Sequence, residues 1–149
     1  MIPYTMQMFM IFLTPMVVGV RIAFLSMFLY IITGLAGFPV FANGGGPGYV
    51  LQPTFGFLIG FMVSMIPNGI LSRKGGFKYC ILGAIAAMAV YYTIGGVSFW
   101  LNMNHVQHKD LSLYKAMTIA IVPFIAVDLA RAFMAAAVAV KLRKMISFH

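Results

Sequence analysis

The stretch PTFGFLIGFMVSMIPNGIL-SRKGG-FKYCILGAIAAMAVYYTIGGVSFWL, residues 53–101, decides the fold. It holds two apolar runs, roughly Pro53 to Leu71 and Phe77 to Leu101, joined by the short basic turn SRKGG. A helix that crosses the hydrocarbon core of a bilayer needs about 20 mainly apolar residues. Each run is close to that length, so the stretch predicts two membrane-spanning helices joined by a turn.

The rest of the chain repeats this pattern. Of its 149 residues, 62% are hydrophobic and 8% are charged, whereas a soluble domain is about half apolar and a quarter charged. Three further apolar runs extend roughly over Tyr4 to Val20, Ile22 to Leu35 and Leu113 to Val140, and we divide the last into a short helix, a bend at Pro123 and a final span. The sequence predicts an all-α polytopic membrane helical bundle with five spans, in one domain over residues 1–149.

The basic residues indicate how the bundle is oriented. The chain has ten Lys and Arg against two acidic residues, Asp110 and Asp128. Under five-span alternation seven cations fall on one side, which is therefore expected to be cytoplasmic. These seven are Arg21, Arg73, Lys74, Lys78, Lys141, Arg143 and Lys144. They lie between apolar runs and form no aromatic-interleaved basic face, so we expect no nucleic-acid partner. The same orientation puts residue 1 outside, which predicts a further span before it.

Asp128 is the most informative single residue, because a carboxylate within a bilayer costs about 2.5–3.5 kcal/mol on insertion scales. We expect it near the outer end of the last span. Arg131 follows three residues later, so both side chains face the same way on a helix. One interpretation is a structural ion pair that makes both charges tolerable. The other is a ligand site that offers one acceptor and one cation.

A glycine-rich segment, FPVFANGGGPGY at residues 38–49, is the second candidate. Its glycines, Gly45 among them, allow a ligand to approach the main chain closely. Asn43 adds a side-chain amide and Tyr49 a hydroxyl group, and Phe41 adds an apolar surface. The segment is either a ligand-contacting loop or an ordinary flexible connection. Thr5 and Gln7, at the external end of the first span, are either ligand contacts or plain interfacial polar residues.

Several functional classes lack the residues they need. His105 and His108 stand three apart with only Asp110 nearby, whereas a metal site needs at least three supported ligands, so no metal is expected. The chain has two acidic residues and no Ser-His-Asp set, Cys-His pair or carboxylate dyad, so almost no residues are present that could perform acid–base catalysis. We therefore expect neither an enzyme nor a bound cofactor.

Three blocks of sequence, in register over nearly the whole chain, carry a family resemblance. They are IPYTMQ at residues 2–7, then Tyr30, Gly34 and Gly37 leading into FPVFA at 38–42 with the glycines up to Pro53-Thr54, and PFI at 123–125 with Asp128 and Arg131. Together they resemble the BioY family, the substrate-binding S components of biotin energy-coupling-factor transporters. The resemblance implies a six-helix fold whose first helix would precede residue 1. It also implies a bacterial inner-membrane location and, as partners, biotin, a transmembrane coupling subunit and two ABC-type ATPases.

The resemblance also implies which residues would contact each chemical group of biotin. Asp128 and Asn43 would accept hydrogen bonds from the ureido N–H groups, and Gln7, Asn43 or a backbone N–H would donate to the ureido carbonyl. Arg131 would face the carboxylate, and Phe38, Phe41 and Tyr49 would form an apolar wall.

The chain departs from the family pattern in its ligand loops. Ala126-Val127 replaces Pro-Gly, Arg131 replaces Lys, and Gln52, Phe55 and Phe57 stand where Gly, Gly and Tyr are usual. Two alternatives therefore stay open. One is an S component for a different vitamin, and the other is a truncated membrane protein that no longer transports.

Overall fold

The computed structural model describes residues 6–146, and within that range the chain folds into five α-helices and no strand. They are α1 (Gln7–Val18), α2 (Val20–Leu35), α3 (Phe55–Ser72), α4 (Gly76–His105) and α5 (Leu113–Ile146). A short 3-10 helix, η1 (Pro47–Leu51), lies within the glycine-rich connection. The predicted all-α fold class is confirmed.

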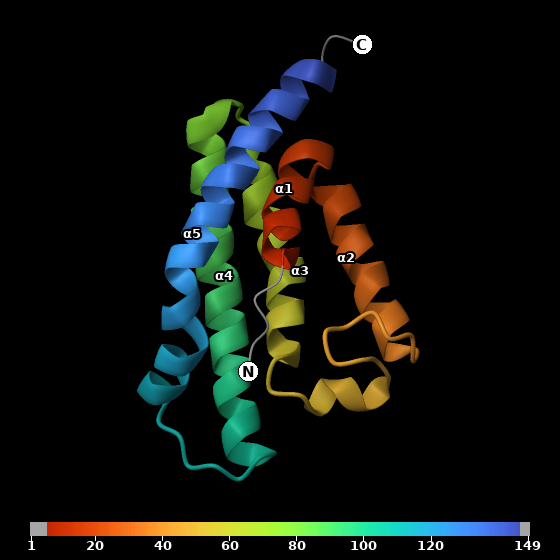
Figure 1. Cartoon of the computed structure of the whole chain (residues 1–149), viewed down its shortest axis with the longest axis vertical. Helices are drawn as coiled ribbons and strands as arrows, with labels where there is room; N and C mark the ends of the chain where they lie inside the picture. The colour runs from red at the N-terminus through yellow and green to blue at the C-terminus, as the bar shows by residue number, and fades with distance from the viewer. Residues whose placement is uncertain (1–5, 147–149) are drawn as a thin grey trace.

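The helices alternate in direction between two ends of the molecule (Figure 1). One end, uppermost in the figure, holds the α1–α2 junction, the α3–α4 turn and the last turn of α5. The opposite end holds the glycine-rich connection before α3 and the α4–α5 connection. The basic residues of the first end include Arg143, whose Nη1 donates to the Ser72 carbonyl oxygen at 2.6 Å, so this cation also satisfies a backbone acceptor at the end of α3.

The boundary between the first two helices differs from the one expected from the sequence. The first two helices separate at Gly19, which has φ of +90°, rather than at Arg21. Glycine adopts positive φ readily, so it is the natural break between two helices in close succession. α1 and α2 are short, at 12 and 16 residues, whereas α3, α4 and α5 are each long and apolar enough to cross a membrane.

The prediction that the last apolar stretch divides at Pro123 was wrong. α5 runs for 34 residues with Pro123 inside it. Proline removes one backbone hydrogen bond, but an apolar helix packed against neighbours tolerates that loss. As a consequence Asp128 lies near the middle of α5, about 22 Å from its start at 1.5 Å per residue, and not near an outer end.

Small residues bring α3 and α4 together. Every fourth position of α3 carries a glycine or a small polar residue: Gly56, Gly60, Ser64, Asn68 and Ser72. A Cβ added to Gly83 of α4 would lie 2.7 Å from the Asn68 carbonyl oxygen. Such stripes let membrane helices approach closely enough for backbone contact. The fully buried Asn68 also donates from Nδ2 to the Phe12 carbonyl oxygen at 3.0 Å, which ties α1 to α3.

We predict that Gly83→Ile lowers stability, because its side chain has no space against the backbone of α3. Overpacking of this kind costs about 1–3 kcal/mol of unfolding free energy. Thermal unfolding in detergent measures the change. Gly48→Ala is the control, since a Cβ there meets no atom within 4 Å. Equal melting temperatures for Gly83→Ile and the control would contradict the close packing described here.

Candidate ligand-binding site

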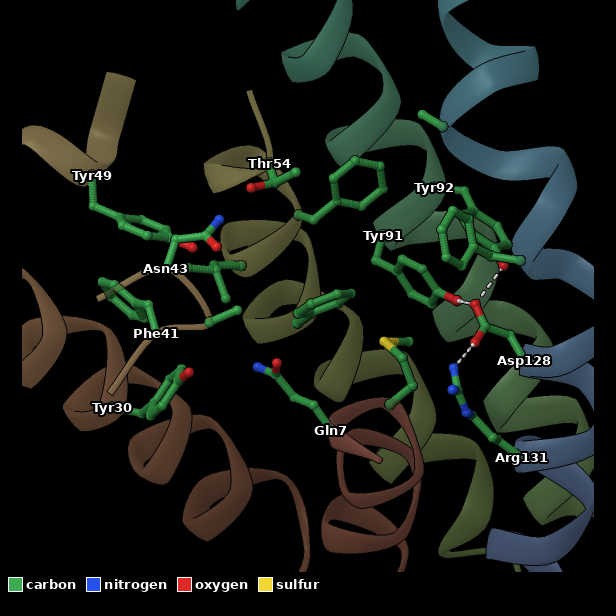
Figure 2. A pocket seen from close by; sticks show the side chains of 17 residues that line it. Gln7, Tyr30, Phe41, Asn43, Tyr49, Thr54, Tyr91, Tyr92, Asp128 and Arg131 are labelled. Carbon is green, nitrogen blue, oxygen red and sulfur yellow. Dashed lines mark hydrogen bonds and ion pairs between the residues drawn. The ribbon is translucent and has the colours of Figure 1, made fainter. Parts of the chain in front are cut away.

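A pocket opens inside the bundle, bounded by all five helices and the glycine-rich loop (Figure 2). Its polar or charged lining residues are Gln7, Tyr30, Asn43, Tyr49, Thr54, Tyr91, Tyr92, Asp128 and Arg131. The remaining lining residues are apolar: Met8, Phe41, Ala42, Phe57, Leu58, Phe61, Ala120 and Phe124. Ligand pockets usually combine an apolar wall with a few placed polar groups in this way.

Asp128 organises the deep end of the pocket. Tyr91 Oη and Tyr92 Oη each donate to Asp128 Oδ2 at 2.6 Å, and Arg131 Nη1 donates to Asp128 Oδ1 at 2.9 Å. The predicted common facing of Asp128 and Arg131 is confirmed by this contact. A carboxylate has about four acceptor positions, of which these donors occupy three. Asp128 is 2% exposed and Arg131 is 9% exposed, so the pair is buried as well as bonded.

Aromatic side chains build the opposite end of the pocket. The rings of Phe41 and Tyr49 lie 4.4 Å apart between centroids, and Tyr30 meets Phe41 edge to face at 5.4 Å. Edge-to-face and offset pairs of this kind are the favoured arrangements of aromatic rings. Tyr30 Oη also donates to the Val40 carbonyl oxygen at 2.9 Å, which ties α2 to the loop.

A tight turn presents Asn43 at the rim. Phe41 and Gly44 exchange two backbone hydrogen bonds, at 2.9 and 3.1 Å, so Ala42 and Asn43 stand at the corner of the turn. Gly44 has φ of +107°, a backbone conformation that residues with a Cβ rarely adopt. The glycines of this segment therefore shape the loop that carries the rim residue.

Gly45 has a packing role in this loop and does not line the pocket. A Cβ at Gly45 would collide with the Phe38 carbonyl oxygen, and the neighbouring Gly46 N–H donates to the Gly34 carbonyl oxygen at 2.7 Å. A Cβ at Gly34 would likewise collide with the Phe41 ring. These close approaches hold the loop against the end of α2.

The structure brings together most of the residues singled out from the sequence. Gln7, Phe41, Asn43, Tyr49, Asp128 and Arg131 all line the same pocket. Thr5 lies outside the described residues. Phe38 was expected in the apolar wall, but it is 61% exposed and does not line the pocket, because the chain turns back after it.

Sequence reasoning missed Tyr91 and Tyr92. Two consecutive phenols in the middle of an apolar run are a usable signal, since a buried hydroxyl needs a hydrogen-bond partner. The apolar lining residues Leu58 and Phe61 were also missed, because any phenylalanine or leucine in a membrane helix fits a core or lipid contact equally well. No cluster of three or more His, Cys, Asp or Glu side chains occurs within residues 6–146.

Comparison with known proteins places this chain in a family. The sequence model of the BioY family matches residues 1–148, nearly the full chain. The chain belongs to the BioY family.

Individual BioY relatives agree with the assignment. The chain is 32% identical to the "Biotin transporter BioY" of Thermotoga maritima, over 97% of this chain and 82% of that protein. It is 40% identical to the "Probable biotin transporter BioY" of Lysinibacillus sphaericus, over 70% of this chain and 58% of that protein. These relatives are named as transporters, in agreement with the expectation that the chain is not an enzyme.

A solved structure shows the same fold. The crystal structure of the S-component for biotin from an ECF-type ABC transporter matches with a TM-score of 0.83 and 18% identity, covering 96% of this chain and 76% of that one. The BioY fold and the apolar helices make this chain a multi-pass membrane protein. The expectation of a helix before residue 1 stays a prediction.

For this BioY chain we predict that Arg131→Met is strongly destabilising. The substitution leaves Asp128 buried without its cation, and breaking a buried ion pair on one side costs about 3–5 kcal/mol. Lys115→Met, at an exposed position of the same helix, is the control. Chemical or thermal unfolding in detergent measures both. If Arg131→Met unfolds like the control, the ion pair contributes nothing to stability.

Proposed function

We propose that the chain is the biotin-binding S component of an energy-coupling-factor uptake transporter in a bacterial inner membrane. The observation that carries the proposal is one pocket with a buried Asp128–Arg131 pair at one end and aromatic rings at the other. Family membership supports it, because relatives that match most of this chain are named biotin transporters.

The lining of the pocket offers hydrogen-bond partners for polar groups of biotin. Biotin has a ureido ring with two N–H donors and one carbonyl, a thioether ring and a valerate carboxylate. Asp128 keeps one free acceptor position on Oδ1, and the Asn43 side-chain oxygen at the rim accepts as well. Arg131 uses one of its five N–H donors on Asp128, so others remain for an oxygen of the ligand.

The apolar rings of biotin fit the remaining walls. Phe41 and Tyr49 flank the loop side, and Phe57 and Phe61 flank the α3 side. Aromatic side chains contribute large contact areas with few rotatable bonds. The apolar rings of the ligand therefore lose their hydration and contact these walls, while the polar side chains at the ends of the pocket fix the orientation of the ligand.

The proposed orientation follows from charge. The end that carries Arg21, Arg73, Lys74 and Arg143 faces the cytoplasm, since Lys and Arg are enriched in cytoplasmic segments. The glycine-rich loop and the mouth of the pocket then face outward. Biotin is captured there, and a transmembrane coupling subunit with two ABC-type ATPases supplies the energy for its release inside.

A second candidate keeps the architecture and changes the vitamin. Phe57 stands where the BioY pattern has tyrosine, and it lines the pocket. Loss of that hydroxyl removes one polar group from the wall, which favours a ligand with fewer polar atoms at that point. Competition of labelled biotin by other vitamins distinguishes the two candidates.

We predict that the purified protein binds biotin and that Asp128→Asn weakens binding by at least about tenfold, equivalent to ~1.4 kcal/mol. The substitution keeps the shape of the side chain but removes the charge that attracts the ureido N–H group. Isothermal titration calorimetry in detergent measures the affinity. Asp110→Asn is a matched control, because Asp110 is the other acidic residue and is exposed in the α4–α5 connection.

Two results would count against this function. Absence of biotin binding by the folded wild-type protein, with tight binding of another vitamin, would favour the second candidate. Equal affinities for Asp128→Asn and Asp110→Asn would remove Asp128 from the binding site.

We predict opposite accessibility for the two ends of the bundle. In a Cys80→Ser background, an impermeant maleimide applied to intact cells should label Val50→Cys in the outer loop and leave Arg73→Cys in the α3–α4 turn unlabelled. Cys80 is buried, so its removal leaves the surface unchanged, whereas Val50 and Arg73 are exposed. Membrane permeabilisation should make both sites reactive. The reverse pattern in intact cells would invert the proposed orientation.

A further inference from the structure

The hydroxyl protons of Tyr91 and Tyr92 are both engaged in hydrogen bonds within the protein. Each phenol has one O–H donor, and each donates it to the same oxygen, Asp128 Oδ2, at 2.6 Å. Figure 2 shows both hydroxyls directed at the Asp128 carboxylate, whose other oxygen faces Arg131. The two hydroxyls therefore retain lone pairs but have no proton left for a ligand.

The surroundings hold Tyr91 in place. Its Cα lies 3.1 Å from the position that a Cβ on Gly60 would occupy, and its ring meets Phe61 edge to face at 5.2 Å. Tyr91 is 1% exposed, so its hydroxyl is not free to turn toward water. The Tyr91 and Tyr92 rings lie 4.4 Å apart between centroids, so the two phenols pack against each other.

This arrangement determines which side chains at the deep end of the pocket can donate hydrogen bonds to a ligand and which can only accept them. Asp128 and the two phenol oxygens accept hydrogen bonds, and Arg131 alone among these four side chains has protons to donate. A ligand group that pairs with these acceptors and also with Arg131 must place an N–H donor beside a carbonyl or carboxylate oxygen. A cyclic urea has this pattern, whereas an ester, an ether or a carboxylate alone has no N–H for the acceptors.

We propose that Tyr91 and Tyr92 are positioning residues that fix the Asp128 carboxylate and select ligands with an N–H donor next to an oxygen. The inference rests on the proposed function and deepens it by assigning ligand selectivity to two phenols that contact Asp128. Selectivity arises because a ligand without the N–H leaves buried acceptors unpaired, which is costly.

The test is a double-mutant cycle on biotin affinity. Tyr91→Phe and Tyr92→Phe should each weaken binding about tenfold (~1.4 kcal/mol) by loosening Asp128. In an Asp128→Asn background the same substitutions should cost less than about threefold, since interacting residues are non-additive. Tyr114→Phe, at an 83% exposed position, is the matched control and should bind like wild type. A tenfold loss that persists in the Asn background would make the two phenols packing residues only and overturn the proposal.

A ligand-free measurement keeps the proposal testable if biotin proves to be the wrong vitamin. Ultraviolet resonance Raman spectra of tyrosine report whether a phenol donates to a strong acceptor. Asp128→Asn should change the tyrosine doublet of the ligand-free protein, and Asp110→Asn should not. Failure of wild-type protein to bind biotin tests the proposed function alone, whereas an unchanged doublet in Asp128→Asn contradicts the positioning role whatever the ligand is.

Discussion

A carboxylate inside an apolar bundle must be matched by hydrogen-bond donors, and the deep end of the pocket is arranged around this need. Asp128 lies mid-helix, where neither water nor lipid headgroups reach it easily. Its donors come from α4 and from the next turn of α5. Because two phenols of α4 donate to this one side chain of α5, they hold the two helices in a single register, and the same contacts form one end of the cavity.

The packing of α3 against α4 makes this geometry possible. Gly60 allows the backbone of Tyr91 to approach α3 closely, and Gly83 accepts the backbone of Asn68 further along the interface. Association of membrane helices depends on such close contact, because the lipid tails are as apolar as the helix surfaces. The small residues that stabilise the fold therefore also set the position from which the phenols reach Asp128.

Much of this could be predicted from the sequence, for physical reasons that apply at particular residues. Long apolar runs fix the helices, and the three-residue spacing of Asp128 and Arg131 fixes their common face. The course of α5 through Pro123 could not be predicted, because neighbours decide whether a proline breaks a membrane helix. Tyr91 and Tyr92 were missed because their role depends on Asp128, which lies 37 and 36 positions further along the chain. Phe38 was misplaced because turn geometry, rather than composition, decides which loop aromatics point inward.

The attachment of the glycine-rich loop to α2 has a kinetic consequence. Tyr30 holds Val40, the Gly46 amide holds Gly34, and the Phe41 ring rests against Gly34. A segment anchored at three points to one helix moves with that helix and not as an independent flap. Displacement of this loop is then coupled to α2, and collective motions of whole helices are slower than the nanosecond fluctuation of a free loop.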